Sequence, residues 1–142
     1  TDSRQRSEIV LREGMAAVVD VSVSRSFPPP VAAACPTVVA DYRKRFLEND
    51  PRGYALASLA VSEADFRTTA AGIDVPALVM VGEHDVLFPP DQARALADAL
   101  PRATYHVIPG AGHFPPLQTP RDVCNQVIPF LCSCEERKDQ DR

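Results

Sequence analysis

A short apolar run, residues 75–82, constrains this chain more than any other stretch. Val-Pro-Ala-Leu-Val-Met-Val-Gly carries no charged or strongly polar side chain, and this pattern is typical of a strand buried on both faces of a parallel sheet. Such a strand needs helices over its faces and further strands beside it. The run therefore predicts an α/β fold, in which ligands bind at the carboxyl ends of the strands.

The segment after this run predicts a helix and a second strand. Two prolines and an aspartate open residues 89–100, where alanines and leucines recur at helical spacing. Residues 104–108 then predict a strand parallel to the first, followed by the glycine loop 109–112. Asp85 follows the first strand and His113 follows this loop. We therefore expect both side chains at the same edge of the sheet.

Asp85 and His113 together are suited to acid–base catalysis. A histidine titrates near neutral pH, so it can take a proton from a hydroxyl group and return it to a leaving group. A carboxylate bonded to the other ring nitrogen fixes the tautomer and stabilises the imidazolium. We expect Gly110 and Gly112 to permit the tight turn that brings His113 back over the sheet edge.

The segments Val75–Asp85 and Val107–His113 resemble the carboxyl-terminal half of α/β-hydrolases. In that family the loop after the penultimate strand carries the acid of a catalytic triad, and the loop after the last strand carries the histidine. The resemblance assigns these roles to Asp85 and His113, whose order agrees with the family order of nucleophile, acid and histidine. We expect neither a cofactor nor a metal ion.

The triad nucleophile is not found in this sequence. No Gly-x-Ser-x-Gly motif and no His-Gly oxyanion loop occurs in the 142 residues, so we expect both to lie upstream of Thr1. Two strands also cannot complete a sheet that buries the first one. We therefore expect the chain to be part of a larger protein whose amino-terminal half of the fold is missing. Alone, it should be inactive and could self-associate through an unpaired strand edge.

Residues 1–72 predict a series of helices. We expect a first helix over residues 6–24, an extended link over 25–30, a second helix from Pro36, and a third from Pro51 capped by Asp50. The predicted domains are a helical cap (1–72), the carboxyl-terminal part of an α/β-hydrolase core (73–131) and a charged, disordered tail (132–142).

The helical region is similar to the cap of 3-oxoadipate enol-lactonases, which open a small lactone ring in bacterial aromatic catabolism. The segments that carry this similarity are Arg12–Met15, Ser24–Phe27, Asp50–Tyr54 and Ala64–Arg67. The family usually has tryptophan between an arginine and a phenylalanine where this chain has Ser26. The resemblance implies a lactone or ester substrate, and our candidates for substrate contacts are Phe27, Phe88 and Phe114.

Two other hypotheses stay open at this point. Esterases, haloalkane dehalogenases and epoxide hydrolases share the fold, and the last two use a carboxylate nucleophile that would also lie upstream. Alternatively, the chain is a non-catalytic remnant that serves as an interaction module. An upstream Gly-x-Ser-x-Gly or Gly-x-Asp motif would decide among these hypotheses.

Composition argues against several other classes of protein. The net charge is −4, with acids and bases interspersed, so we expect no nucleic-acid or membrane surface. No apolar run approaches the ~20 residues of a membrane span. The four cysteines are scattered, and Cys132-x-Cys134 is not a zinc-binding spacing. These observations predict a cytoplasmic protein with reduced thiols.

Overall fold

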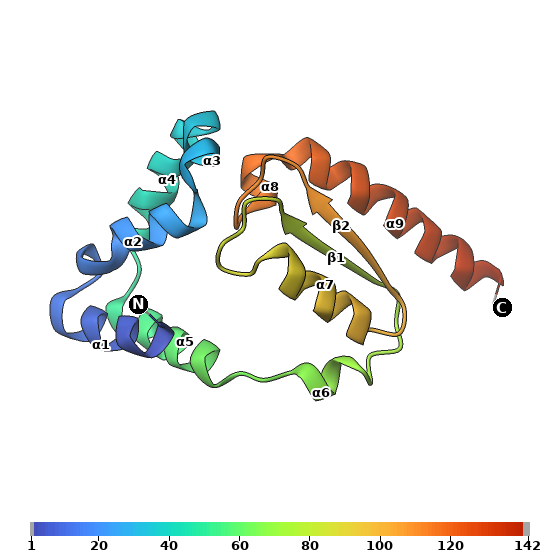
Figure 1. The fold of residues 1–142 in the computed structure, drawn as a ribbon, viewed down its shortest axis with the longest axis horizontal. Coiled ribbons are helices and arrows are strands. Elements are labelled where there is room, and N and C mark those ends of the chain that lie inside the picture. Colours follow the sequence, from blue (N-terminus) through green and yellow to red (C-terminus); the bar gives the residue numbers. More distant parts are fainter. Residues whose placement is uncertain (1, 141–142) are drawn as a thin grey trace. The chain divides into compact units, whose positions relative to one another are not determined.

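The computed structural model describes residues 2–140, without the side chains of residue 67 and residues 136–140. The chain divides between Phe66 and Arg67 into two compact units (Figure 1). The boundary predicted from the sequence, at residues 72/73, lies later in the chain, and the assignment of residues 1–72 as a cap stays a prediction. A short helix, α6 (Arg67–Ala70), packs on the second unit and buries Ala70.

The first unit, which we call the helical unit, contains α1 (Ser3–Glu13), α2 (Ala16–Ser26), α3 (Pro29–Ala34), α4 (Pro36–Leu47) and α5 (Pro51–Glu63). Helix α1 packs along α5 and against α2, and α2 packs against α4. The predicted starts at Pro36 and Pro51 are confirmed. Asp50 caps α5, because its Oδ2 accepts the Gly53 N–H at 2.6 Å.

Aliphatic and aromatic side chains hold the helical unit together. Its buried cluster comprises Val10, Met15, Val18, Val19 and Phe46. Edge-on and tilted rings continue from this cluster: the ring centroids of Tyr42 and Phe46 lie 5.8 Å apart, and those of Phe46 and Tyr54 lie 5.2 Å apart. Aromatic pairs at such distances stabilise a core beyond simple burial.

The prediction of one helix over residues 6–24 is wrong. Gly14 has φ +80°, in the left-handed region, and its N–H donates to Val10 O at 2.9 Å, which ends α1. The extended link predicted for 25–30 is also shorter than expected. Helix α2 continues to Ser26 and α3 begins at Pro29, because a proline is well suited to the first helical position.

The second unit, the sheet unit, contains α6, β1 (Ala77–Gly82), α7 (Pro90–Ala99), β2 (Ala103–Ile108), α8 (Pro115–Gln118) and α9 (Pro120–Gln140). Strands β1 and β2 are parallel, as predicted, with a register that runs from Ala77↔Ala103 to Gly82↔Ile108. Their carboxyl ends therefore meet at one edge, and burial in β1 is deepest there, at Val81 and Gly82.

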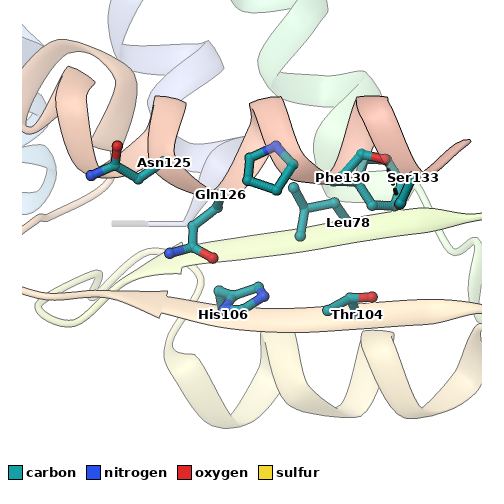
Figure 2. Close-up of a pocket in the computed structure, with 8 residues that line it drawn as sticks. Leu78, Thr104, His106, Asn125, Gln126, Phe130 and Ser133 are labelled. Carbon is teal, nitrogen blue, oxygen red and sulfur yellow. Dashed lines mark hydrogen bonds between the residues drawn. The ribbon is translucent and has the colours of Figure 1, made fainter. Parts of the chain in front are cut away.

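One helix lies over each face of this two-stranded sheet (Figure 1). Tyr105 faces α7, since its hydroxyl donates to Pro90 O at 2.9 Å and Arg94 lies 4.0 Å above its ring. The next residue of β2, His106, faces α9 (Figure 2). This alternation follows from the two-residue period of a strand.

The prediction that residues 132–142 form a disordered tail is wrong for 132–140. These residues are the last turns of α9; residues 141–142 lie outside the described part. The charged end is rich in glutamate, arginine and lysine, which are good helix formers, and extending an existing helix needs no new nucleus. Pro129 lies inside α9 without ending it.

Candidate functional site

Asp85 lies in the turn that follows β1 and is nearly buried, with 7% of its surface exposed. Its N–H donates to Gly82 O at 3.1 Å. One carboxylate oxygen, Oδ1, accepts the backbone N–H groups of Leu87 (2.8 Å) and Phe88 (3.0 Å). These two donors fix the carboxylate plane, so that Oδ2 is left for a different partner.

That partner is His113. The distance from Asp85 Oδ2 to His113 Nδ1 is 2.9 Å. With an ionised carboxylate, Nδ1 carries the proton and donates it, so Nε2 of the neutral ring keeps a free lone pair. About a third of the histidine side chain (33%) is exposed, against 6% for that of Asp85. The ring is therefore accessible while its carboxylate partner is shielded, as a general base requires.

A tight turn carries the chain from β2 to His113. Ala111 N–H donates to Ile108 O (3.4 Å), Pro109 is the second residue of the turn, and Gly110 has φ +67°. This is the pattern of a type II turn, which favours proline and then glycine. Gly110 thus has the conformation that the turn needs, whereas the positive-φ glycines of the described chain, Gly14 and Gly110, do not include Gly112; the part of Gly112 in the turn stays a prediction.

A close backbone contact at Gly82 sets the spacing between the two loops. A Cβ atom at Gly82 would lie 2.0 Å from Gly112 O and 2.5 Å from Ala111 O, both of them backbone atoms. His84 N–H also donates to Ala111 O at 2.8 Å. The end of β1 thus lies directly against residues 109–113, which we call the histidine loop, and only glycine permits this close approach.

The three phenylalanines predicted to contact substrate lie in different surroundings. The Phe114 ring packs edge-on against His113, with centroids 4.9 Å apart. Phe88 is 39% exposed in the segment between β1 and α7 that also carries Asp85, which we call the acid loop. Phe27 belongs to the helical unit, where its ring is buried and lies 5.2 Å from the Tyr42 ring. Substrate contact by any of these three residues stays a prediction.

Two residues that sequence reasoning did not assign to the site hold the histidine loop. Gly110 N–H donates to Glu83 Oε2 (2.9 Å), and Gly112 N–H donates to Gln118 Oε1 (2.6 Å). The first contact joins residues 27 positions apart. No local pattern signals such a contact, because it depends on the register between β1 and β2.

His106 lines a pocket of about 270 Å³ between the sheet and α9 (Figure 2). The pocket is lined by Leu78, Thr104, His106, Asn125, Gln126, Pro129, Phe130 and Ser133. It shares no residue with the Asp85–His113 pair.

The described part of the chain has neither a cluster of metal ligands nor a membrane-spanning helix. Its side chains form no group of three or more histidine, cysteine, aspartate or glutamate residues placed to hold a metal ion. No helix in residues 2–140 combines the length and the apolar character that a membrane span needs. The four cysteines are all free thiols.

Comparison with known proteins identifies the family. Residues 25–120 match the family model described as the alpha/beta hydrolase fold. The chain belongs to this family. The match includes both the acid loop and the histidine loop, so the strand order and loop positions described above are those of a hydrolase fold.

Solved structures and one curated protein show similarity over part of their length. An esterase from Thermogutta terrifontis has a TM-score of 0.86 and 30% identity, covering 93% of this chain and 49% of that structure. An enol-lactonase from Burkholderia xenovorans LB400 has a TM-score of 0.85 and 35% identity, covering 90% and 49%. A biotin biosynthesis bifunctional protein of Teredinibacter turnerae is 33% identical over 78 residues, which is 55% of this chain and 14% of that protein. The chain thus spans about half the length of these two solved structures.

Proposed function

We propose that this chain supplies the acid and the base of a hydrolase triad, Asp85 and His113, acting on a lactone or carboxylic ester in the cytoplasm. The observation that carries this proposal is the 2.9 Å contact between His113 Nδ1 and Asp85 Oδ2. Because Oδ1 is already occupied by two backbone N–H groups, the carboxylate presents one defined oxygen to the histidine.

The chemistry follows from the tautomer that this contact selects. Nε2 of His113 takes the proton of a serine hydroxyl as the oxygen attacks the substrate carbonyl, and then delivers it to the leaving alkoxide. Asp85 stays ionised and stabilises the imidazolium that forms between the two steps. A water molecule, activated by the same nitrogen, then hydrolyses the acyl-enzyme. In this proposal the serine and the oxyanion donors belong to a segment that precedes Thr1.

Two relatives support a lactone or ester as substrate. The chain is 35% identical to an enol-lactonase and 30% identical to an esterase over nine-tenths of its length. Both names describe cleavage of an acyl–oxygen bond, which releases an alkoxide or an enolate that the protonated form of His113 can neutralise. Because the helical unit resembles the cap of enol-lactonases, Phe27 is kept as a proposed substrate contact from that unit.

The test uses the longer protein in which this chain is continued by its upstream segment. We expect turnover of an enol-lactone or of 4-nitrophenyl acetate, and loss of that turnover after treatment with a serine-directed phosphonate. The 142-residue chain alone serves as a control and should show no turnover above background.

A haloalkane and an epoxide complete the substrate panel. Halide release or epoxide opening that resists the phosphonate would indicate a carboxylate nucleophile and would contradict the serine-hydrolase proposal. Absence of turnover on all four substrates, in a folded protein, would favour a non-catalytic interaction module.

A further inference from the structure

We infer that Glu83 is a positioning residue, whose carboxylate holds the turn of the histidine loop so that His113 stays within hydrogen-bond reach of Asp85. This role rests on the proposed function of Asp85 and His113 as acid and base. Glu83 is a charged residue with an exposed side chain, two positions before Asp85. It acts through the loop backbone and does not itself touch the reacting atoms.

The geometry of the turn shows what Glu83 contributes. In the turn Ile108–Ala111, the turn's own hydrogen bond uses Ala111 N–H and Ile108 O, and at 3.4 Å it is long. Gly110 N–H takes no part in that bond and donates instead to Glu83 Oε2 at 2.9 Å. The bond to Glu83 is therefore the shorter and better formed of the two. The tip of the turn therefore depends on Glu83 more than on its own backbone bond.

Glu83 contacts this turn at its first residue and near its tip. Its backbone N–H donates to Ile108 O at 3.0 Å, where the turn begins, while its side chain accepts from Gly110 near the tip. His84 N–H and the Asp85 carboxylate then contact Ala111 O and His113 in sequence. Residues 83–85 thus contact the segment from Ile108 to the His113 side chain one after another.

The side chain of Gln118 holds the other end of the histidine loop. Its Oε1 accepts the N–H of Gly112, the residue directly before His113, at 2.6 Å. Gly112 is buried while Gly110 is exposed, so water competes for the Gly110 N–H and not for that of Gly112. For this reason we place the sensitive contact at Glu83.

A charge effect is the competing explanation, since Glu83 Oε2 also lies 3.8 Å from His84 Nε2. Two variants distinguish positioning of the loop from an effect of the charge, because each variant removes only one of the two. Glu83→Gln keeps an acceptor oxygen at the same reach and removes the charge. Glu83→Asp keeps the charge and withdraws the oxygens by one methylene, out of reach of Gly110. Neither variant disturbs the buried core, so both should fold.

The experiment compares these variants in the complete, active protein, by kcat, KM and the pH profile of kcat/KM. We expect Glu83→Asp to lower kcat about tenfold, equivalent to about 1.4 kcal/mol, with KM nearly unchanged, and Glu83→Gln to stay within about threefold of wild type with the same pH profile. Exchange of the Gly110 amide with solvent should be faster in Glu83→Asp than in Glu83→Gln. The reverse order of kcat, or equal kcat in all three proteins, would overturn the positioning role.

His113→Ala, measured alongside, separates this inference from the proposed function. If His113→Ala abolishes turnover and Glu83→Asp leaves kcat unchanged, the positioning role alone is wrong. If His113→Ala leaves kcat unchanged, the proposed function is wrong, and the positioning role of Glu83, which depends on it, is wrong as well.

Discussion

The two units of this chain are ordered by different forces. In the helical unit, buried aliphatic side chains and aromatic rings pack against one another around Phe46, and the buried polar residues there are small serines, such as Ser22, whose hydroxyl lies 3.0 Å from that of Tyr42. At the carboxyl edge of the sheet unit, order comes from hydrogen bonds and from the close approach of Gly82 to the histidine loop. Packing tolerates changes of shape at moderate cost, whereas a hydrogen-bonded pair must keep its distance and direction.

The difference bears on where function is sensitive to substitution. A helix that shifts by a fraction of an ångström still buries its apolar face. The same shift in the histidine loop moves Nε2 of His113 relative to any reacting atom, and a misplacement of about 1 Å can cost about 10²-fold in rate. We therefore expect variants of the helical unit to reduce stability first, and variants of the site loops to reduce catalysis first.

The largest expected effects are those of Asp85→Asn and His113→Ala in the complete protein, and Asp85→Asn shows the role of the acid. The amide oxygen should take the place of Oδ1, because two N–H donors face it, and this leaves the amide NH₂ facing His113 Nδ1. An NH₂ donor stabilises the tautomer with the proton on Nε2, so the base loses its lone pair. We expect kcat to fall by about 10⁴-fold, as in the equivalent change in a serine protease, and the melting temperature to change little.

His113→Ala is the companion variant and should be at least as damaging, because it removes the base altogether. Thermal melts of both variants, followed by circular dichroism, show whether the fold survives. Activity within tenfold of wild type in both variants would contradict the assignment of acid and base.

The next largest effect concerns the helical unit. Phe46→Ala removes a ring that is 7% exposed and lies between Tyr42 and Tyr54. We expect the free energy of unfolding to fall by about 3 kcal/mol or more, measured by urea denaturation of this chain or of the complete protein. The neighbouring Leu47 is 43% exposed, so Leu47→Ala should cost far less. Equal losses from the two variants would show that the ring cluster is not the stabilising centre.

The sequence predicted those parts of the structure that follow from local pattern and strand topology. The apolar run before Asp85 and the helix after it were enough to predict two parallel strands whose carboxyl ends meet. That topology also brings Asp85 and His113 to one edge. Proline and aspartate at the start of α5 likewise predicted a helix boundary, because capping is a local interaction.

The remaining features depend on choices between nearly equal local alternatives or on distant contacts. Gly14 costs only about 1 kcal/mol inside a helix, so the sequence does not reveal that the chain turns there. The role of Glu83 depends on the register that places it beside Gly110. The end of α9 was predicted as a tail because charge suggested disorder, although the same residues favour helix once a helix is present.

A smaller effect on catalysis is expected from Gly82→Ala. The new Cβ would meet Gly112 O at 2.0 Å, so the histidine loop must move away from β1. We expect kcat to fall by about 10²-fold in the complete protein, with a loss of stability of about 1–3 kcal/mol from overpacking. Gly72→Ala is the matched control, since its nearest neighbour would be Thr69 O at 3.5 Å, an ordinary contact. A Gly82→Ala enzyme with wild-type kcat would show that the loop spacing is not critical.

The smallest expected effect is a difference in alkylation rate between cysteines, which tests how well the helical unit is packed around Cys35. Burial raises the pKa of the Cys35 thiol, and its Sγ donates to Val31 O at 3.1 Å; both favour the thiol over the reactive thiolate. At pH 8 we therefore expect Cys35 to react with iodoacetamide several-fold more slowly than Cys124 and Cys132, which are exposed on α9, as measured by mass spectrometry of tryptic peptides. The difference should disappear in 8 M urea, where all the thiols share one environment. Equal rates in the folded protein would mean that the segment joining α3 and α4 opens to solvent faster than alkylation. In that case the packing of the helical unit would be looser, at this point, than the hydrogen-bonded loops of the site.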